Sequence, residues 1–349
     1  MNTLENKKQN LFLRLFKGNP LTILIAVAIY GVTAAMVYSG SAPRQFTNMI
    51  ISVSCYIVMA VSLNLVVGFL GELSLGHAGF MSAGLFSGCL VSISLAEVLP
   101  MAVRMPVSMI IGGIVAAIVG FIVGLPALRL KGDYLAIVTL ACGEIIKSVI
   151  TNLKFTGGAL GLNTSEVYSS AKELLPFAVI LVFVTMLVVM NLKKSKQGRA
   201  IMAIRDNRIA AEAMGVNITK YKLTVFVIAA FFAGAAGVLY GHSLANIKPD
   251  TFDYNMSIEI LVIVVLGGMG SIRGSIIAAI ILRALPEMLR GLEDYRMLIY
   301  SVLLIIIMLL NASPKFAEFK GRWSVKNMGK AIGGLFNKNK KAEEAGKDE

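Results

Sequence analysis

The chain has 349 residues, of which 56% are hydrophobic and 15% are charged, and its mean hydropathy is +0.76. A chain this apolar cannot hide its hydrophobic side chains from water by folding alone, so the composition excludes a soluble globular protein and indicates an integral membrane protein. The net charge of +13 would suggest nucleic-acid binding in a soluble protein. Here basic loops beside membrane spans and attraction to anionic lipid account for the charge, so we expect membrane lipid, and no nucleic acid, as a partner.

Apolar runs predict about ten transmembrane helices, each needing about 20 residues to cross the bilayer. Seven runs contain no charged residue, at residues 21–43, 45–71, 73–96, 105–128, 174–192, 223–247 and 297–314. Three more, at residues 134–151, 256–272 and 274–290, are broken by Glu144, Lys147, Glu259 and Arg273. The sequence therefore predicts an all-α integral membrane protein, a polytopic bundle of about ten helices.

The orientation follows from the basic residues, because Lys and Arg beside membrane spans collect in the cytoplasm. Ten spans place the basic residues of the N-terminus, of residues 193–222 and of the C-terminal tail on one side. We therefore predict a basic cytoplasmic N-terminus at 1–18, a transmembrane domain at 19–313 with a cytoplasmic loop at 193–222, and a charged cytoplasmic tail at 314–349. The first apolar run is longer than the core of a secretory signal peptide, which favours a retained span.

Small residues cluster from Gly68 to Gly88, and two interpretations stay open. Glycine and serine let helices approach closely in lipid, or they mark a helix that breaks and exposes polar backbone to an aqueous path. In the second case the path would include Asn64, Glu72, Ser74 and His77. The structural glycines in this region are Gly71, Gly76 and Gly79, and a second cluster, which predicts a tight cytoplasmic turn between two spans, is Gly267, Gly268 and Gly270.

Ionisable residues inside a span are costly and are therefore informative. Glu144 and Lys147 are three residues apart, so they share a helix face and can partly neutralise each other. Glu144 could line a path or pair between helices, whereas Glu259 lies near the end of its span and could reach the interface. Thr139, Glu144 and Glu259 complete the candidate path residues. His77 is more typical of a packed, hydrogen-bonded residue than of a proton relay.

The polar loop at 193–222 predicts a short helix over residues 207–214. Asp206 or Asn207 would cap its start and Gly215 would end it. The apolar face of this helix would consist of Ile209, Ala210, Ala213 and Met214. A small apolar face with a charged rim suits insertion into a groove on a soluble partner.

Motifs for catalysis or metal binding are absent from the sequence. There are two His and three Cys, and no phosphate-binding loop, Cys-x-x-Cys or His-Glu-x-x-His motif occurs. We expect no catalytic residue, no metal and no cofactor in this chain. An intramembrane enzyme would need a nucleophile paired with a base, which no spacing suggests.

Four stretches, at residues 71–84, 128–147, 198–217 and 261–279, carry a resemblance to a known family. With the loop TGGALGL at 156–162, they resemble the permease subunits of branched-chain amino acid ABC importers of the LivM type. The similarity runs from about residue 46 to 310. The resemblance implies a bacterial-type plasma (inner) membrane protein that works by alternating access, with a second homologous permease, two cytoplasmic ABC ATPases that bind ATP and Mg²⁺, and an extracytoplasmic substrate-binding protein.

The polar loop resembles the family's ATPase-coupling loop. The residues that match are Arg199, Arg205, Asp206, Asn207, Arg208, Glu212, Ala213 and Gly215. The Glu-Ala-x-Gly core is shorter than the coupling motif of other importers. Related permeases are thought to carry urea, short amides or other amino acids, so these substrates remain alternatives to leucine, isoleucine and valine. A stand-alone ion-coupled secondary transporter, using Glu144 and Lys147, is the alternative of another class.

Overall fold

A computed structural model describes residues 30–31, 33–39, 43–130 and 132–289, together with 295, 298–299, 301–302, 305–306 and 309. The chain divides into two compact units, Met1–Met288 and Leu289–Glu349, and the elements below lie in the first. The predicted spans at 21–43 and 297–314 fall largely outside the described residues, and the N-terminal segment at 1–18 and the tail at 314–349 fall wholly outside them.

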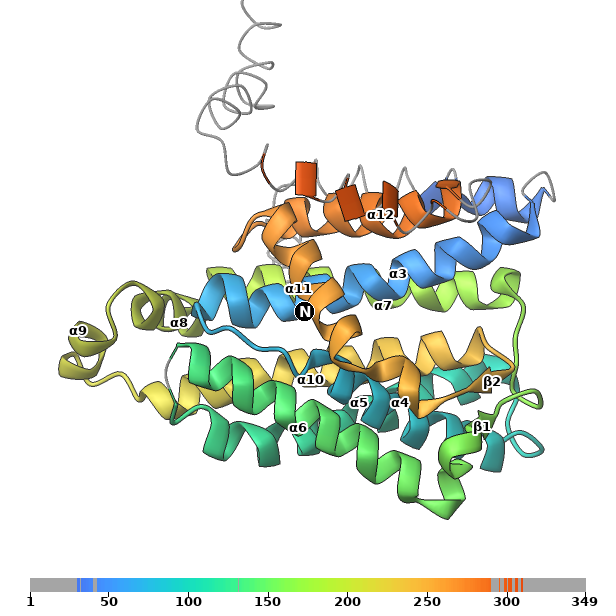
Figure 1. Cartoon of the computed structure of the whole chain (residues 1–349), viewed down its shortest axis with the longest axis horizontal. Helices are drawn as coiled ribbons and strands as arrows, with labels where there is room; N and C mark the ends of the chain where they lie inside the picture. Colours follow the sequence, from blue (N-terminus) through green and yellow to red (C-terminus); the bar gives the residue numbers. More distant parts are fainter. Residues whose placement is uncertain are drawn as a thin grey trace, which may run out of the picture. The chain divides into compact units, whose positions relative to one another are not determined.

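Helices account for almost all of the described structure, which confirms the all-α prediction (Figure 1). In chain order the elements are α3 (Arg44–Asn64), the π-helix η1 (Leu65–Leu70), α4 (His77–Ser94), α5 (Met101–Ala127), α6 (Asp133–Asn152), the 3₁₀ turns η2 (Lys154–Thr156) and η3 (Gly158–Leu160), β1 (Leu162–Asn163), α7 (Ala171–Lys194), α8 (Lys196–Asp206), α9 (Arg208–Ala213), α10 (Ile218–His242), β2 (Asn246–Ile247), η4 (Pro249–Phe252), α11 (Tyr254–Gly267) and α12 (Ile272–Met288).

Six helices among the described residues are long and apolar enough to cross a membrane. They are Phe46–Leu70, α4, α5, α6, α7 and α10, and they coincide with six of the predicted spans. The predicted spans at 256–272 and 274–290 instead form α11 and α12, of 14 and 17 residues. A helix of 14 residues is only about 21 Å long, so α11 is too short to cross the bilayer as a straight span.

The helix ends sort into two groups, as the predicted alternation of spans requires. Figure 1 shows α8 and α9 at one end of the helices, here called the loop end, and β1 and β2 at the other, here called the strand end. At the strand end β1 pairs with β2 in antiparallel register, with Leu162 opposite Ile247 and Asn163 opposite Asn246. This short ladder joins the connection that follows α6 to the connection that follows α10.

Helices α4, α5 and α10 pack against one another more extensively than any other group, and glycine makes this possible. A Cβ atom on Gly84 of α4 would lie 2.2 Å from the Cα of Gly234 on α10, and one on Gly112 of α5 would lie 2.5 Å from the carbonyl oxygen of Gly84. No side chain fits at such distances, so the helices touch through their backbones. For the middle of α4, the packing interpretation of the small residues is therefore correct.

Candidate functional site

The polar loop folds into two helices, α8 and α9, that connect α7 to α10. Asn207 caps α9, because its Oδ1 accepts a hydrogen bond from the Ala210 amide at 3.0 Å. Gly215, with φ of 78°, ends the turn after α9 in the left-handed region. The predicted short helix is confirmed, with Asn207 as the cap.

Helix α9 turns an apolar face away from the rest of the chain. Ile209 and Met214 are 82% and 83% exposed, and Ala210 and Ala213 beside them are exposed as well. Only Ala211 is buried, where it seats α9 on the neighbouring elements. Glu212 is also exposed. Two large apolar side chains at this level of exposure, one on α9 and one at the residue directly after it, indicate a surface that a partner covers.

Arg205 connects α8 to the end of η1. Its Nη1 donates to the Gly68 carbonyl oxygen at 3.1 Å, and its Nε and Nη2 donate to Asp206 Oδ1 at 3.0 and 2.8 Å. The last carbonyls of a helix have no partner within the helix, and an arginine side chain can satisfy them. The aliphatic part of Arg205 packs on Gly71, where a Cβ would lie 2.6 Å from Arg205 Cγ.

Asn64 extends this connection to the turn between α11 and α12. The Asn64 side chain is buried; its Oδ1 accepts from the Gly270 amide and its Nδ2 donates to Ser275 Oγ, both at 2.8 Å. Gly268 and Gly270 have positive φ, as a tight turn of this kind requires. Gly267 contacts Gly274 through backbone, since a Cβ on Gly267 would lie 2.5 Å from the Gly274 carbonyl carbon. A tight turn is present where it was predicted, but α11 is too short to span the membrane, and the cytoplasmic position of the turn stays a prediction.

The helix predicted at 73–96 is broken at its beginning. After η1 the chain turns at Gly71, with φ of 78°, and runs without helical structure to Gly76 before α4 begins at His77. We call residues 71–76 the break. The Leu75 amide donates to Thr139 Oγ1 on α6 at 3.0 Å, and a Cβ on Gly76 would lie 2.4 Å from the Thr139 carbonyl oxygen. For this segment the predicted break in the helix is present, and its exposure to an aqueous path stays a prediction.

A buried ion pair fixes the break to α10. Lys222, whose side chain is 1% exposed, donates from Nζ to Glu72 Oε1. Removing one partner of such a pair leaves an uncompensated buried charge, which is strongly destabilising. Lys222 is the last residue of the polar loop region, so the region contacts the η1–break segment through Arg205 before α9 and through Lys222 after it.

The two remaining acidic path candidates lie in ion pairs of their own. Glu144 pairs with Lys147 at 2.5 Å on α6, as their spacing predicts. Glu259 on α11 pairs with Arg283 Nη1 on α12 at 3.5 Å, and the Tyr56 hydroxyl of α3 donates to Glu259 Oε2 at 3.2 Å. The Arg283 guanidinium lies over the Tyr56 ring, 4.3 Å from its centroid.

His77 is packed, as expected. It is 2% exposed and its Nε2 lies 2.8 Å from Ser62 Oγ. A Cβ on Gly79, one turn further along α4, would lie 2.8 Å from the Cα of Gly143 on α6, so the beginning of α4 touches α6 closely. Asn64, Ser74, His77 and Thr139 are all buried, whereas Glu72, Glu144 and Glu259 keep part of their side chains exposed. Their role in a path stays a prediction.

Comparison with known proteins shows the family to which the chain belongs. The sequence profile of the family described as "Branched-chain amino acid transport system / permease component" matches residues 45–309. The chain belongs to this family. The match covers every element from α3 to α12 except the first residue of α3, so the polar loop and the break are both parts of the permease fold.

Two similar proteins are both named LivM. The high-affinity branched-chain amino acid transport system permease protein LivM of Salmonella typhimurium is 34% identical over 337 residues, covering 86% of this chain and 73% of the relative. LivM of Escherichia coli K12 is 34% identical over 289 residues, covering 73% and 66%. The permease protein LivH of the same system in E. coli K12 is 31% identical over 135 residues, covering 38% and 43%. No solved structure matches the chain.

Two charged residues that form ion pairs in the structure, Lys222 and Arg283, are not among the site residues that the sequence predicted. Lys222 looks like one more basic residue of a cytoplasmic loop, and only its position against Glu72 reveals a buried ion pair. Arg283 interrupts the apolar run at 274–290, so its position inside a span was a signal that could have identified it. In the described part of the chain, no group of three or more His, Cys, Asp or Glu is placed to hold a metal ion.

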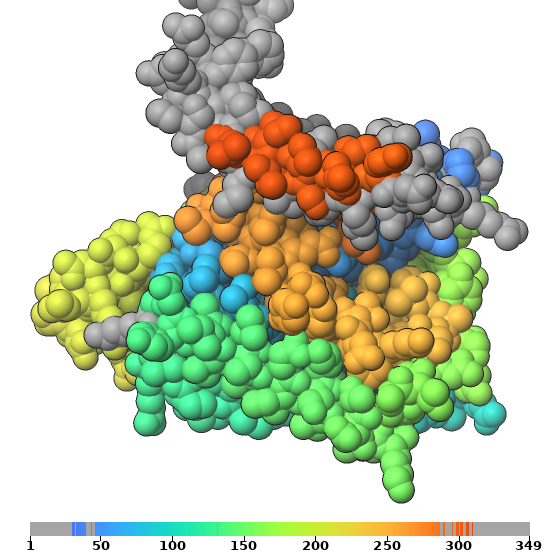
Figure 2. Space-filling view, in the orientation of Figure 1, coloured from blue at the N-terminus to red at the C-terminus, as the bar shows by residue number. Residues whose placement is uncertain are grey.

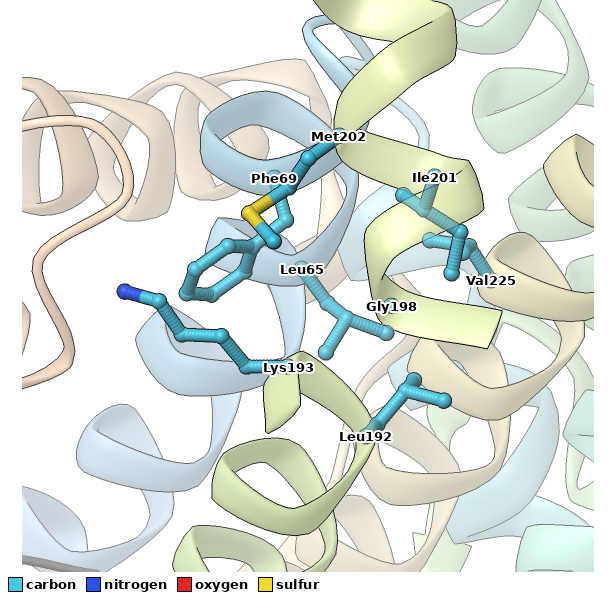
Figure 3. Close-up of a pocket in the computed structure, with 8 residues that line it drawn as sticks. All are labelled: Leu65, Phe69, Leu192, Lys193, Gly198, Ile201, Met202 and Val225. Carbon is cyan, nitrogen blue, oxygen red and sulfur yellow. The ribbon is translucent and has the colours of Figure 1, made fainter. Parts of the chain in front are cut away.

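A small apolar pocket lies where α8 packs on η1 (Figure 3). Its lining residues are Leu65, Phe69, Leu192, Lys193, Gly198, Ile201, Met202 and Val225. Lys193 runs beside the Phe69 ring in Figure 3, with its Nζ 4.7 Å from the centroid of that ring. The other side chains that line the pocket are apolar, and they hold α8 against η1, α7 and α10.

Proposed function

We propose that this permease is a transmembrane subunit of an ATP-binding cassette importer that carries branched-chain amino acids across the inner membrane. It would act with a second homologous permease, two cytoplasmic ABC ATPases and an extracytoplasmic substrate-binding protein. Family membership supports the transport role, and the similarity to both LivM and LivH of one organism supports a pair of related permeases. The observation that carries the proposal is the exposed apolar face of α9.

Helix α9 would dock on an ATPase. Ile209 and Met214 offer the apolar anchors, and the exposed carboxylate of Glu212 lies at their rim, which matches a helix that lies in a groove of its partner. The ATPase would bind ATP and Mg²⁺, so this chain needs no cofactor or catalytic residue of its own. The basic residues of the polar loop support a cytoplasmic position for the loop end.

Movement of α9 would reach the membrane through the two contacts that flank it. Arg205 holds the Gly68 carbonyl at the end of η1, and Lys222 holds Glu72 in the break. When the ATPases close on ATP and displace α9, both contacts transmit the displacement to the same segment. Alternating access then follows as a shift between two packings of this segment, each favoured by one state of the ATPases.

The substrate is proposed from the relatives, whose names state branched-chain amino acid transport. Leucine, isoleucine and valine suit a path between apolar helices that offers few polar groups. Urea, short amides and other amino acids remain alternative substrates. Uptake of labelled leucine against these competitors, in cells whose own uptake systems are deleted, distinguishes among them.

Docking of α9 is tested by co-purification of the full chain from its native membrane. The variant Ile209→Glu places a charge in the proposed groove, and Leu160→Glu places the same charge at an 84% exposed position at the strand end. Desolvating an unpaired charge in an interface costs several kcal/mol, so we expect Ile209→Glu to recover at least about tenfold less ATPase. Leu160→Glu should recover it as the unchanged chain does. Equal recovery from both variants, or no ATPase from the unchanged chain, contradicts the proposal.

A self-sufficient ion-coupled carrier is the second candidate, favoured by the partly exposed Glu144–Lys147 pair on α6. Such a carrier should lose uptake in the Glu144→Gln variant and should be insensitive to Ile209→Glu. The importer predicts the opposite sensitivity. Uptake measured at equal abundance of the two variants in the membrane separates the two candidates.

A further inference from the structure

The break leaves an unusual number of backbone groups without hydrogen bonds. The amides of Gly71 and Glu72 donate to the Val66 carbonyl oxygen and that of Leu75 donates to Thr139. Within the described part of the chain, the five carbonyl oxygens from Gly71 to Leu75 accept no hydrogen bond. Ser74, a residue that is 1% exposed, has no hydrogen-bond partner for its Oγ there either.

These groups lie beside the spanning helices and not beyond their ends. Thr139, which accepts from Leu75, is six residues after the first residue of α6, about 9 Å along its axis. Lys222, which holds Glu72, is buried within α10. The Ala78 amide at the beginning of α4 donates to Ser257 Oγ of α11 at 3.2 Å. The break therefore runs at membrane depth, where unpaired backbone is tolerated only inside protein or against water.

The break is not enclosed by the described residues. Gly71 is exposed and Leu73 and Leu75 are partly exposed. In Figure 2 a blue surface from this part of the chain is visible between the green of α6 and the orange of α11 and α12. By contrast, the exposed side chains of α5 are all apolar, including Ile114, Ile118 and Ile122, as those of a lipid-facing helix are. The face with the break is therefore unsuited to lipid.

We propose that the break forms one wall of a water-filled path and binds the zwitterionic head of an amino-acid substrate. This inference rests on the proposed transport function. The free carbonyl oxygens accept hydrogen bonds from an ammonium group, which has three donors and no acceptor. In other transporters, the carbonyl oxygens of unwound backbone coordinate cations in this way. Glu72 does not compete for the ammonium group, because Lys222 already neutralises it.

The carboxylate of the amino-acid substrate would bind at the other end of the break, where α4 begins. Helix α4 is 18 residues long and begins at His77, so its N-terminus carries a partial positive charge. The unpartnered hydroxyl of Ser74 lies three residues before this start and can donate to a carboxylate. One segment thus offers both charges of a zwitterion a complement, while the apolar side chain of the substrate remains free to contact neighbouring helices.

Thiol accessibility tests the wall of the path. In a chain with Cys55, Cys89 and Cys142 replaced by alanine, we would introduce Leu73→Cys or Leu75→Cys and treat inside-out vesicles with a charged, membrane-impermeant methanethiosulfonate. Because thiolates form in water and not in hydrocarbon, both should react at least about tenfold faster than Ile118→Cys on the lipid-facing side of α5. Gln197→Cys, at an exposed position of α8 outside the proposed docking face, serves as the accessible reference. If both break variants react as slowly as Ile118→Cys, the break does not form the wall of a water-filled path and the proposal is wrong.

Ligand protection tests the zwitterion site in the same vesicles. Ligands reach the break directly from the cytoplasmic side, so selection by a binding protein plays no part. Leucine should slow the modification of Leu73→Cys, whereas 4-methylpentanoate, which lacks the ammonium group, and 3-methylbutylamine, which lacks the carboxylate, should not. Equal protection by either analogue, or protection by sodium ions alone, overturns the assignment to a zwitterion. Leucine uptake by cells that carry the same variants tests the transport function separately, since it does not depend on where the path lies.

Discussion

At the scale of single residues, the loop end depends on side chains that hold backbone groups. Arg205 caps the Gly68 carbonyl of η1, and Asn64 bridges Gly270 and Ser275. Both contacts join segments that are far apart in sequence, and both use an arginine or amide group with several donors or acceptors. A residue of this kind can transmit a displacement, because its directional hydrogen bonds join two segments that are far apart in the chain.

The Arg205→Ala variant should therefore separate ATP hydrolysis from transport. A hydrogen bond from a charged group contributes about 1.5–3 kcal/mol, so we expect leucine uptake to fall by about tenfold or more while the ATPase still co-purifies and hydrolyses ATP. Lys196→Ala is the control, because Lys196 is an exposed basic residue of the same helix that is not among the residues matching the coupling loop. A parallel loss of ATPase recovery in Arg205→Ala would show that Arg205 serves docking, not transmission.

At the scale of elements, backbone contact between helices decides the packing of α4. Gly84 sits against Gly234 with no space for a side chain, whereas a Cβ on Gly143 of α6 would lie 3.5 Å from the nearest atom, the Cα of Gly76. The two glycines look alike in the sequence. Only the separation of the packed helices distinguishes a position that excludes a methyl group from one that accepts it.

The variants Gly84→Ala and Gly143→Ala should therefore differ. Overpacking costs about 1–3 kcal/mol, so Gly84→Ala should lower the thermal unfolding temperature in detergent, whereas Gly143→Ala should leave it nearly unchanged or raise it slightly. The measurement is the loss of monodisperse protein after heating, followed by size-exclusion chromatography. Similar unfolding temperatures for the two variants would contradict the close contact of α4 with α10.

At the scale of the whole molecule, the loop end and the strand end should face opposite sides of the membrane. Loop-end Gln197 of α8 and strand-end Leu160 are both exposed, so each can carry a cysteine in a cysteine-free chain. The basic residues of the polar loop predict that Gln197→Cys reacts with an impermeant reagent only in inside-out vesicles, and Leu160→Cys only in intact spheroplasts. Labelling in the reverse pattern would invert the proposed orientation.

The sequence by itself determined the features that depend on neighbouring residues. Apolar length predicted the six spans from Phe46 to His242, the Asn207 cap and Gly215 predicted α9, and the glycines near Gly268 predicted a tight turn. These features follow from local rules of length, capping and backbone freedom, which a short stretch of sequence contains completely.

Only the tertiary structure decided which residues meet. Arg205 and Gly68 are 137 residues apart, and Lys222 and Glu72 are 150 apart, so neither contact leaves a signal in local sequence. The same holds for the break, because glycine-rich sequence is compatible with a close helix contact and with an unwound backbone alike. The choice between them depends on which neighbours satisfy the backbone groups, and packing brings those neighbours together only when the chain has folded.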